Sequence, residues 1–122
     1  MPTVIIVDDH EGFRLSAKRL LETEGYVVVG EAADGASALE GARELTPDVM
    51  VVDVHLPDTD GFALAAELAQ LVPQPRIVLV SSHDASDFGP LVDRSPAVGF
   101  VSKGELSGET LGGLLDEIGE PA

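Results

Sequence analysis

The sequence has 122 residues and a mass of 12.7 kDa, which provides for one hydrophobic core and excludes a two-domain enzyme. It holds 22 acidic and 7 basic residues, a formal charge of -15, and no cysteine, which excludes disulfides, thiolate metal sites and thiol nucleophiles. Because it lacks a Lys/Arg run, an apolar run of about 20 residues and a basic signal-like start, we expect a cytoplasmic protein that binds neither nucleic acid nor membrane directly.

The first half of the chain predicts two strands, each followed by a helix. An apolar run at residues 4–7 predicts a buried strand, and a weaker run at 27–29 predicts a second one. Helical spacing follows each run; the first helix ends near Gly25, and the second has Asp34 or Gly35 as its cap. The apolar stripes of the two helices consist of Phe13, Ala17, Leu20 and Leu21, and of Ala38, Leu39, Ala42 and Leu45.

The second half predicts three more strands and three more helices. Apolar runs predict buried strands at residues 49–52, 77–80 and 98–101. The helix after the first of these runs is stopped by prolines, the next is a short helix at 86–94, and the last has Ser107 as its cap. The stripes of the first and last of these helices consist of Leu64, Ala65, Leu68 and Leu71, and of Leu111, Leu114, Leu115 and Ile118.

Strand and helix alternate five times, which is typical of a doubly wound α/β domain. The four strong runs do not alternate apolar with polar residues, which indicates a parallel sheet covered on both faces. The second strand is the least apolar and suits an edge, so we predict a five-stranded parallel sheet with the flavodoxin-like order 2-1-3-4-5. Ligands of such sheets bind at the carboxyl ends of the strands, between strands 1 and 3.

Polar residues follow the predicted strands at this edge. They are Asp8 and Asp9, Asp53, Ser81 and Ser82, and Ser102 and Lys103. Three converging carboxylates repel one another unless a cation lies among them, and oxygen ligands of this kind suit Mg²⁺. A lysine and a hydroxyl opposite them can contact phosphoryl oxygens, and the carboxylate of Asp53 can attack phosphorus and hold it as an acyl phosphate.

These residues resemble the receiver (CheY-like) domain of bacterial two-component response regulators, in particular those of the NarL/FixJ type. The resemblance covers nearly the whole chain. Its motifs are Asp8-Asp9, the segment from Asp53 to Gly61 with the sequence DVHLPDTDG, Ser81, and the segment from Gly99 to Lys103 with the sequence GFVSK.

The resemblance implies a role for each matching residue. Asp53 would be the phosphoacceptor, and Asp8, Asp9, Asp53 and the backbone carbonyl of His55 would hold Mg²⁺. Ser81 and Lys103 would bind the phosphoryl group. Ser81 and Phe100 would form the switch, and because Phe100 has no hydroxyl this switch would depend on packing.

The same resemblance implies a signalling domain rather than an enzyme. Its partner would be a histidine kinase or a phosphotransfer protein, and it would self-associate at most weakly through the face formed by the fourth and fifth helices. Residues 1–122 read as a single receiver domain with no output domain in this chain. They would be a stand-alone receiver or, as we favour, the amino-terminal piece of a transcription regulator.

Three histidines fall in loops that surround the proposed site: His10, His55 and His83. His55 and His83 lie two residues beyond Asp53 and Ser81, and we hypothesise that they tune dephosphorylation or its pH dependence. Binding of Zn²⁺ or Cu²⁺ is the alternative, because imidazole beside carboxylates suits these ions better than Mg²⁺.

Two other functions compete with a phospho-accepting receiver. A phosphatase of the haloacid-dehalogenase type needs a second aspartate two residues after its nucleophile, where this sequence has His55. A phosphorylation-independent receiver-like interaction module usually lacks an acidic or lysine position of the site, and all of those positions are intact here. The phospho-accepting receiver is therefore the favoured function.

Overall fold

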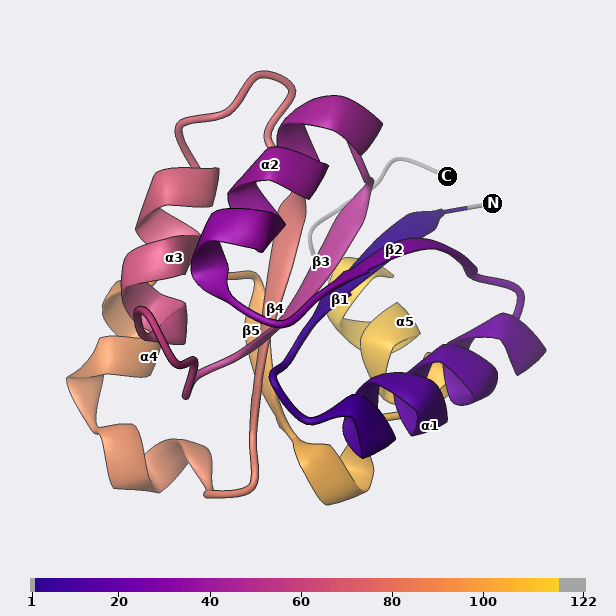
Figure 1. Cartoon of the computed structure of the whole chain (residues 1–122). Helices are drawn as coiled ribbons and strands as arrows, with labels where there is room; N and C mark the ends of the chain where they lie inside the picture. Colours follow the sequence, from indigo (N-terminus) through magenta and orange to yellow (C-terminus); the bar gives the residue numbers. More distant parts are fainter. Residues whose placement is uncertain (1, 117–122) are drawn as a thin grey trace.

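The computed structural model describes residues 2–116, which form a parallel sheet with helices on both faces (Figure 1). The strands are β1 (Thr3–Val7), β2 (Val27–Ala32), β3 (Val49–Asp53), β4 (Arg76–Ser81) and β5 (Gly99–Ser102). The helices are α1 (Glu11–Thr23), α2 (Gly35–Leu45), α3 (Gly61–Leu68), α4 (Pro90–Arg94) and α5 (Gly108–Asp116). The order is β2-β1-β3-β4-β5 and all pairs are parallel, so the predicted fold is confirmed.

The central strands bury both of their faces, as their continuous apolar runs predicted. Along β1, Ile5 and Val7 pack with α2 and α3, whereas Val4 and Ile6 pack with α1 and α5. Strands β3 and β4 alternate between the same two clusters. Among the described residues, no helix is both long enough and apolar enough to span a membrane.

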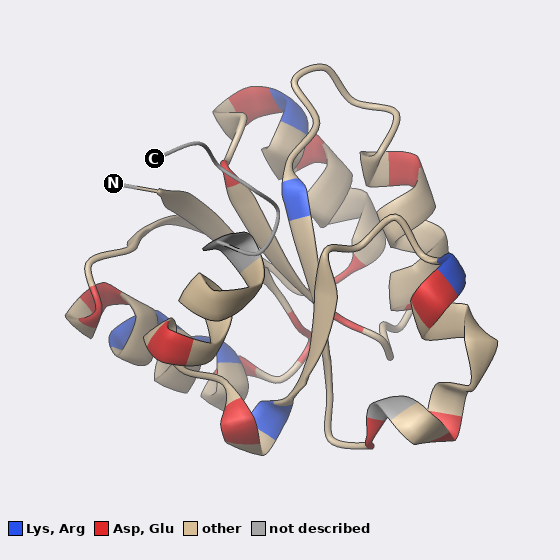
Figure 2. Cartoon of the chain, turned by 180° about the vertical axis from the view of Figure 1, so that it is seen from behind, with Lys and Arg blue, Asp and Glu red and all other residues tan. Residues whose placement is uncertain are grey.

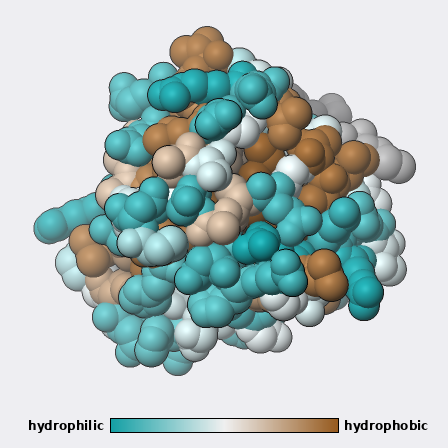
Figure 3. Space-filling view, viewed as in Figure 1, coloured by the Kyte–Doolittle hydropathy of each residue, from teal (hydrophilic) through white to brown (hydrophobic). Residues whose placement is uncertain are grey.

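Two leucines of the predicted apolar stripes, Leu20 and Leu45, are exposed and not buried in the core. Leu20 of α1 is 39% exposed, since Ala17 and Leu21 form the narrow stripe of that helix that faces the sheet. Leu45 is the last residue of α2 and is 45% exposed beside the edge strand β2. Figure 3 shows hydrophobic surface over this part of the molecule, where Val27 and Val29 are also exposed.

Several predicted element boundaries differ from the structure. Strand β2 has six residues rather than three, and the exposure of its residues alternates because it is an edge strand that pairs only with β1. Strand β5 begins at Gly99, one residue later than predicted. Helix α3 ends at Leu68, so Leu71 packs against the core from outside the helix.

The predicted fourth helix is wrong as a single element. The chain forms a 3₁₀ turn at Ala85–Phe88 and then the short helix α4. Gly89 separates the two with a positive φ of 56°, and Pro90 has no N–H to continue a hydrogen-bonded ladder.

The predicted caps of two helices are present. The Asp34 side chain accepts a hydrogen bond from Ser37 N, and the Ser107 Oγ accepts one from Thr110 N at 3.0 Å. Ile118 lies outside the described residues.

The loop from β3 to α3 is fixed at both of its ends. Gly61 donates a hydrogen bond to Val54 O at 2.7 Å, and a Cβ there would lie 2.6 Å from Asp53 O. The Asp58 carboxylate accepts hydrogen bonds from Gly35 N and Ala36 N at the start of α2. These hydrogen bonds hold the pKa of Asp58 below its ordinary value, so the loop after Asp53 is tied to a neighbouring helix by an ionised carboxylate.

We predict that Gly61→Ala lowers the free energy of unfolding by about 2 kcal/mol, because its Cβ would collide with backbone atoms that cannot rotate away. Gly113→Ala is the matched control, since no atom lies within 4 Å of a Cβ there and alanine favours a helix, so it should stabilise by about 0.5 kcal/mol. Urea unfolding monitored by circular dichroism measures both changes. Equal stability of the two variants would contradict the backbone contact at Gly61.

Candidate functional site

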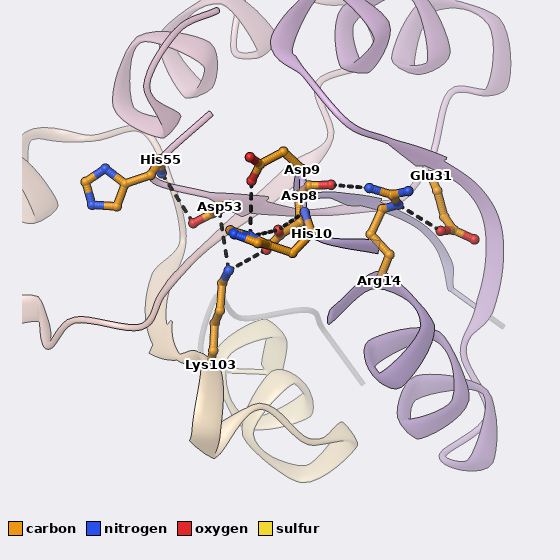
Figure 4. Close-up of polar contacts among 8 residues, drawn as sticks. All are labelled: Asp8, Asp9, His10, Arg14, Glu31, Asp53, His55 and Lys103. Carbon is orange, nitrogen blue, oxygen red and sulfur yellow. Dashed lines mark hydrogen bonds and ion pairs between the residues drawn. The ribbon is translucent and has the colours of Figure 1, made fainter. Parts of the chain in front are cut away.

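Two buried carboxylates and one lysine meet at the carboxyl ends of the central strands. Asp8 follows β1 and is 0% exposed, and Asp53 ends β3 and is 2% exposed. Lys103 follows β5, and its Nζ lies 2.6 Å from Asp8 Oδ2 and 3.4 Å from Asp53 Oδ2 (Figure 4). Because β1 and β3 are neighbours in the sheet, Asp8 and Asp53 meet at its carboxyl edge, as the sequence predicted.

Asp9 and His10 complete an acidic cluster on the solvent side of this pair. The His10 Nδ1 lies 2.9 Å from Asp8 Oδ1 and 3.1 Å from Asp9 Oδ1. Asp8, Asp9, His10 and Asp53 each offer one ligand atom, and these atoms all lie within 4.8 Å of one another. From the sequence we placed His10 near the site but did not group it with Asp8 and Asp9. Its position directly after this acidic pair is the sequence signal that could have identified it.

The cluster carries more negative than positive charge. Burial raises the pKa of the Asp53 carboxyl, and the neighbouring charge of Asp8 raises it further. Lys103 and the backbone N–H of His55 act in the opposite direction but do not cancel this rise in pKa. Three carboxylates against one ammonium leave a surplus of two negative charges in the cluster. Figure 2 shows that Asp and Glu outnumber Lys and Arg along the rest of the chain as well, so few other cations are available to compensate this charge.

The residues present fit a divalent cation. Their donors are mainly carboxylate oxygens, which hard divalent cations prefer. Asp8 Oδ2 is buried and makes no well-directed hydrogen bond with any described residue, although the Lys103 ammonium is close to it. A cation at this point would supply charge that the ammonium alone does not.

Lys103 and the loop after β1 are held in place by α1. The Lys103 Nζ lies 4.7 Å from the centre of the Phe13 ring, a cation–π contact. The Arg14 Nη1 donates a hydrogen bond to Asp8 O at 2.6 Å, and its Nε pairs with Glu31. The first turns of α1 therefore fix both a carboxylate and the lysine of the site.

Ser81 lies beside the charged cluster rather than within it. It is the last residue of β4, is fully buried, and its Oγ accepts a hydrogen bond from His83 N at 3.0 Å. Ser82 is exposed, and Ser102 pairs with Ser81 across the β4 and β5 ladder.

An aromatic cluster lies next to the site and joins the segments that follow β3 and β4 with α3 and β5. The His55 and His83 rings are 5.8 Å apart, and both contact Phe88. Phe88 also contacts Phe62 and Phe100, at 5.5 and 5.7 Å. Figure 4 shows that the His55 ring points away from the acidic cluster, so only its backbone faces Asp53. We did not identify Phe88 from the sequence, because it lies in a segment that we predicted as one helix and that Gly89 divides in the structure.

Comparison with known proteins gives consistent matches. The sequence model of the response regulator receiver domain matches residues 4–111. The response regulator GacA of Pseudomonas aeruginosa is 35% identical over 105 residues, 85% of this chain and 49% of its own length. The chain spans about half the length of the curated relatives it matches.

Solved structures agree with the sequence matches. The signal receiver domain of NarL from Mycobacterium tuberculosis is 34% identical with a TM-score of 0.85, and the alignment covers 98% of each chain. A two-component response regulator of the LuxR family from Aurantimonas is 33% identical with a TM-score of 0.84, over 97% of this chain and 84% of the other.

We predict that Asp53→Asn stabilises the metal-free protein at pH 7 by about 1 to 2 kcal/mol. Because folding raises the pKa of Asp53 above its ordinary 3.8, the protonated carboxyl favours the fold at low pH, and that stability is lost as the pH rises through the raised pKa. Asparagine does not ionise, so the variant avoids this loss. Urea unfolding of both proteins in the presence of a chelator at pH 4 and pH 7 tests this prediction. It would be contradicted if the gain in unfolding free energy of Asp53→Asn over the native chain did not grow with pH.

Proposed function

The chain belongs to the response regulator receiver domain family, and we propose that it accepts a phosphoryl group on Asp53 and switches a partner surface in response. The observation that carries this proposal is the buried carboxylate of Asp53 beside Asp8 and Lys103, at the carboxyl end of the middle strand. A phosphoryl group on Asp53 would lie beside Lys103, and charged groups of this kind position a phosphoryl group for in-line transfer.

Mg²⁺ is the cation that we propose for this reaction. Asp8, Asp9, Asp53 and the backbone carbonyl of His55 would hold it, with Asp8 acting mostly through water. When bound, such an ion neutralises charge on the phosphoryl oxygens and on the carboxylates around them. The excess negative charge of the cluster supports this assignment.

In the proposed transfer, an Asp53 oxygen forms a bond to phosphorus while the bond from phosphorus to the donor breaks. The donor would be the phosphohistidine of a histidine kinase or phosphotransfer protein, and its imidazole leaves as the phosphoryl group moves. The Lys103 ammonium, now shared between Asp8 and Asp53, would contact a phosphoryl oxygen, and the Ser81 hydroxyl would contact another. The chemistry is therefore that of a signalling domain and not of a classical enzyme.

The proposed output is a change in the face formed by α4, β5 and α5. Ser81 would move toward the phosphoryl group and Phe100 would turn inward, and Phe100 lines a groove of about 670 Å³ on this face. Leu114 and Glu105 also line the groove. Weak self-association through this face, a cytoplasmic location and control of transcription through an output domain are parts of the same proposal.

The acyl phosphate can be tested directly by intact mass after incubation with acetyl phosphate and Mg²⁺. We expect the native chain to gain one phosphoryl group, and we expect none for Asp53→Ala or when a chelator is present. Asp93→Ala, which removes an exposed acid of α4, is the matched control and should react like the native chain. No gain under any condition would favour the phosphorylation-independent interaction module.

We also propose that His55 and His83 slow the loss of the phosphoryl group. The two rings meet each other and Phe88 in edge-on or tilted contacts, next to the loop that follows Asp53. Because the His55 ring points away from the acidic cluster (Figure 4), the rings would act by packing this loop and restricting the route of water to the acyl phosphate, and not by contact with the phosphoryl group. We expect the double variant His55→Ala, His83→Ala to lose phosphate severalfold faster, as followed by intact mass after the donor is removed. An unchanged rate between pH 6 and 8 would contradict both this shielding and any tuning by the imidazoles.

A further inference from the structure

The cation site contains a nitrogen donor besides its oxygens. His10 Nδ1 lies within 3.1 Å of oxygens of Asp8 and Asp9, and one ring nitrogen of His10 belongs to the group of ligand atoms that lie within 4.8 Å of one another. Figure 4 shows the His10 imidazole beside the carboxylates of Asp8 and Asp9, to which dashed lines connect it. The ring, although mostly exposed, is therefore placed where it can act as a ligand.

The backbone of His10 holds this ring in position. His10 N donates a hydrogen bond to Asp8 Oδ1 at 2.8 Å, which fixes the turn that directs the imidazole inward. His10 precedes α1, where its side chain makes no capping hydrogen bond, and the side chain is 67% exposed. The imidazole is thus not needed to start the helix, and a cation can reach it from solvent.

The buried carboxylates keep lone pairs for an ion although their oxygens have other contacts. Asp8 Oδ1 accepts a hydrogen bond from His10 N and Asp53 Oδ1 accepts one from His55 N, and a carboxylate has about four lone-pair sites. The Lys103 ammonium approaches Oδ2 of both Asp8 and Asp53, whereas His10 approaches the Oδ1 atoms of Asp8 and Asp9. One imidazole and three carboxylates are four side-chain donors, which matches the coordination number that Zn²⁺ prefers. Mg²⁺ takes oxygen ligands and water, so it gains nothing from the imidazole.

We propose that His10 makes this a mixed nitrogen and oxygen site that binds a first-row transition cation such as Zn²⁺ more tightly than Mg²⁺. The inference rests on the cation site of the proposed function and adds the residue that determines which cation this site prefers. Zn²⁺ would then compete with Mg²⁺ at Asp53.

Calorimetric titration of the metal-free full chain with Zn²⁺ and with Mg²⁺ tests the proposal. We expect the native chain to bind Zn²⁺ at least tenfold more tightly than Mg²⁺, and His10→Ala to lose at least tenfold in Zn²⁺ affinity while its Mg²⁺ affinity changes less than twofold. His83→Ala is the matched control, because His83 is also exposed but lies in the aromatic cluster, and it should keep both affinities. The absorption spectrum of bound Co²⁺ gives an independent readout, and His10→Ala should change it whereas His83→Ala should not.

Three results would overturn the proposal. They are an unchanged Zn²⁺ affinity in His10→Ala, an equal loss in His83→Ala, and a native chain that prefers Mg²⁺. Each of these leaves the proposed phosphoryl transfer standing, because that transfer is measured separately by the mass gain on Asp53. A native chain that binds neither cation would remove the shared cation site as well.

Discussion

The repulsion between buried carboxylates is the constraint on which the rest of the site depends. Asp8, which follows β1, and Asp53, which ends β3, have almost no exposure, and Lys103 is the cation that the fold places between them. Burial of such charges costs several kcal/mol each unless they are compensated, and one ammonium compensates only part of this cost. The metal-free protein therefore keeps uncompensated negative charge at this site, which favours the binding of a divalent cation.

The parallel sheet makes this arrangement possible because it supplies rigid, dry strands. Val4 to Val7 and Val49 to Val52 are packed on both faces, so the residues that follow them have little freedom. Gly61 permits the chain after Asp53 to pass against the backbone, and Asp58 anchors the same loop on α2. The packing of the core therefore holds like charges close together despite their repulsion.

The sequence predicted the fold and the meeting of the strand ends, because both follow from local apolar runs and from the few topologies that parallel strands allow. It did not predict features that depend on contacts distant in the chain or on a single dihedral angle. Asp58 caps a helix that begins 23 residues earlier, and the positive φ of Gly89 divides the fourth helix. Leu20 and Leu45 fit an apolar stripe by spacing, but Leu20 lies beside the narrow stripe of α1 that faces the sheet, and Leu45 is the last residue of α2.

Strand β5 connects the charged cluster to the aromatic one. Phe100 lies within it and contacts Phe88, and Lys103 follows it directly. As an edge strand that pairs only with β4, it is less buried than the strands at the centre of the sheet. Movement of an edge strand disrupts fewer contacts than movement of a central one. If the Lys103 ammonium exchanges Asp8 for a phosphoryl oxygen, the resulting shift of Lys103 would therefore move β5, and with it Phe100, at a lower cost in free energy than it would move a central strand. Phe100 lines the groove beside α5, so the shift would reach that groove.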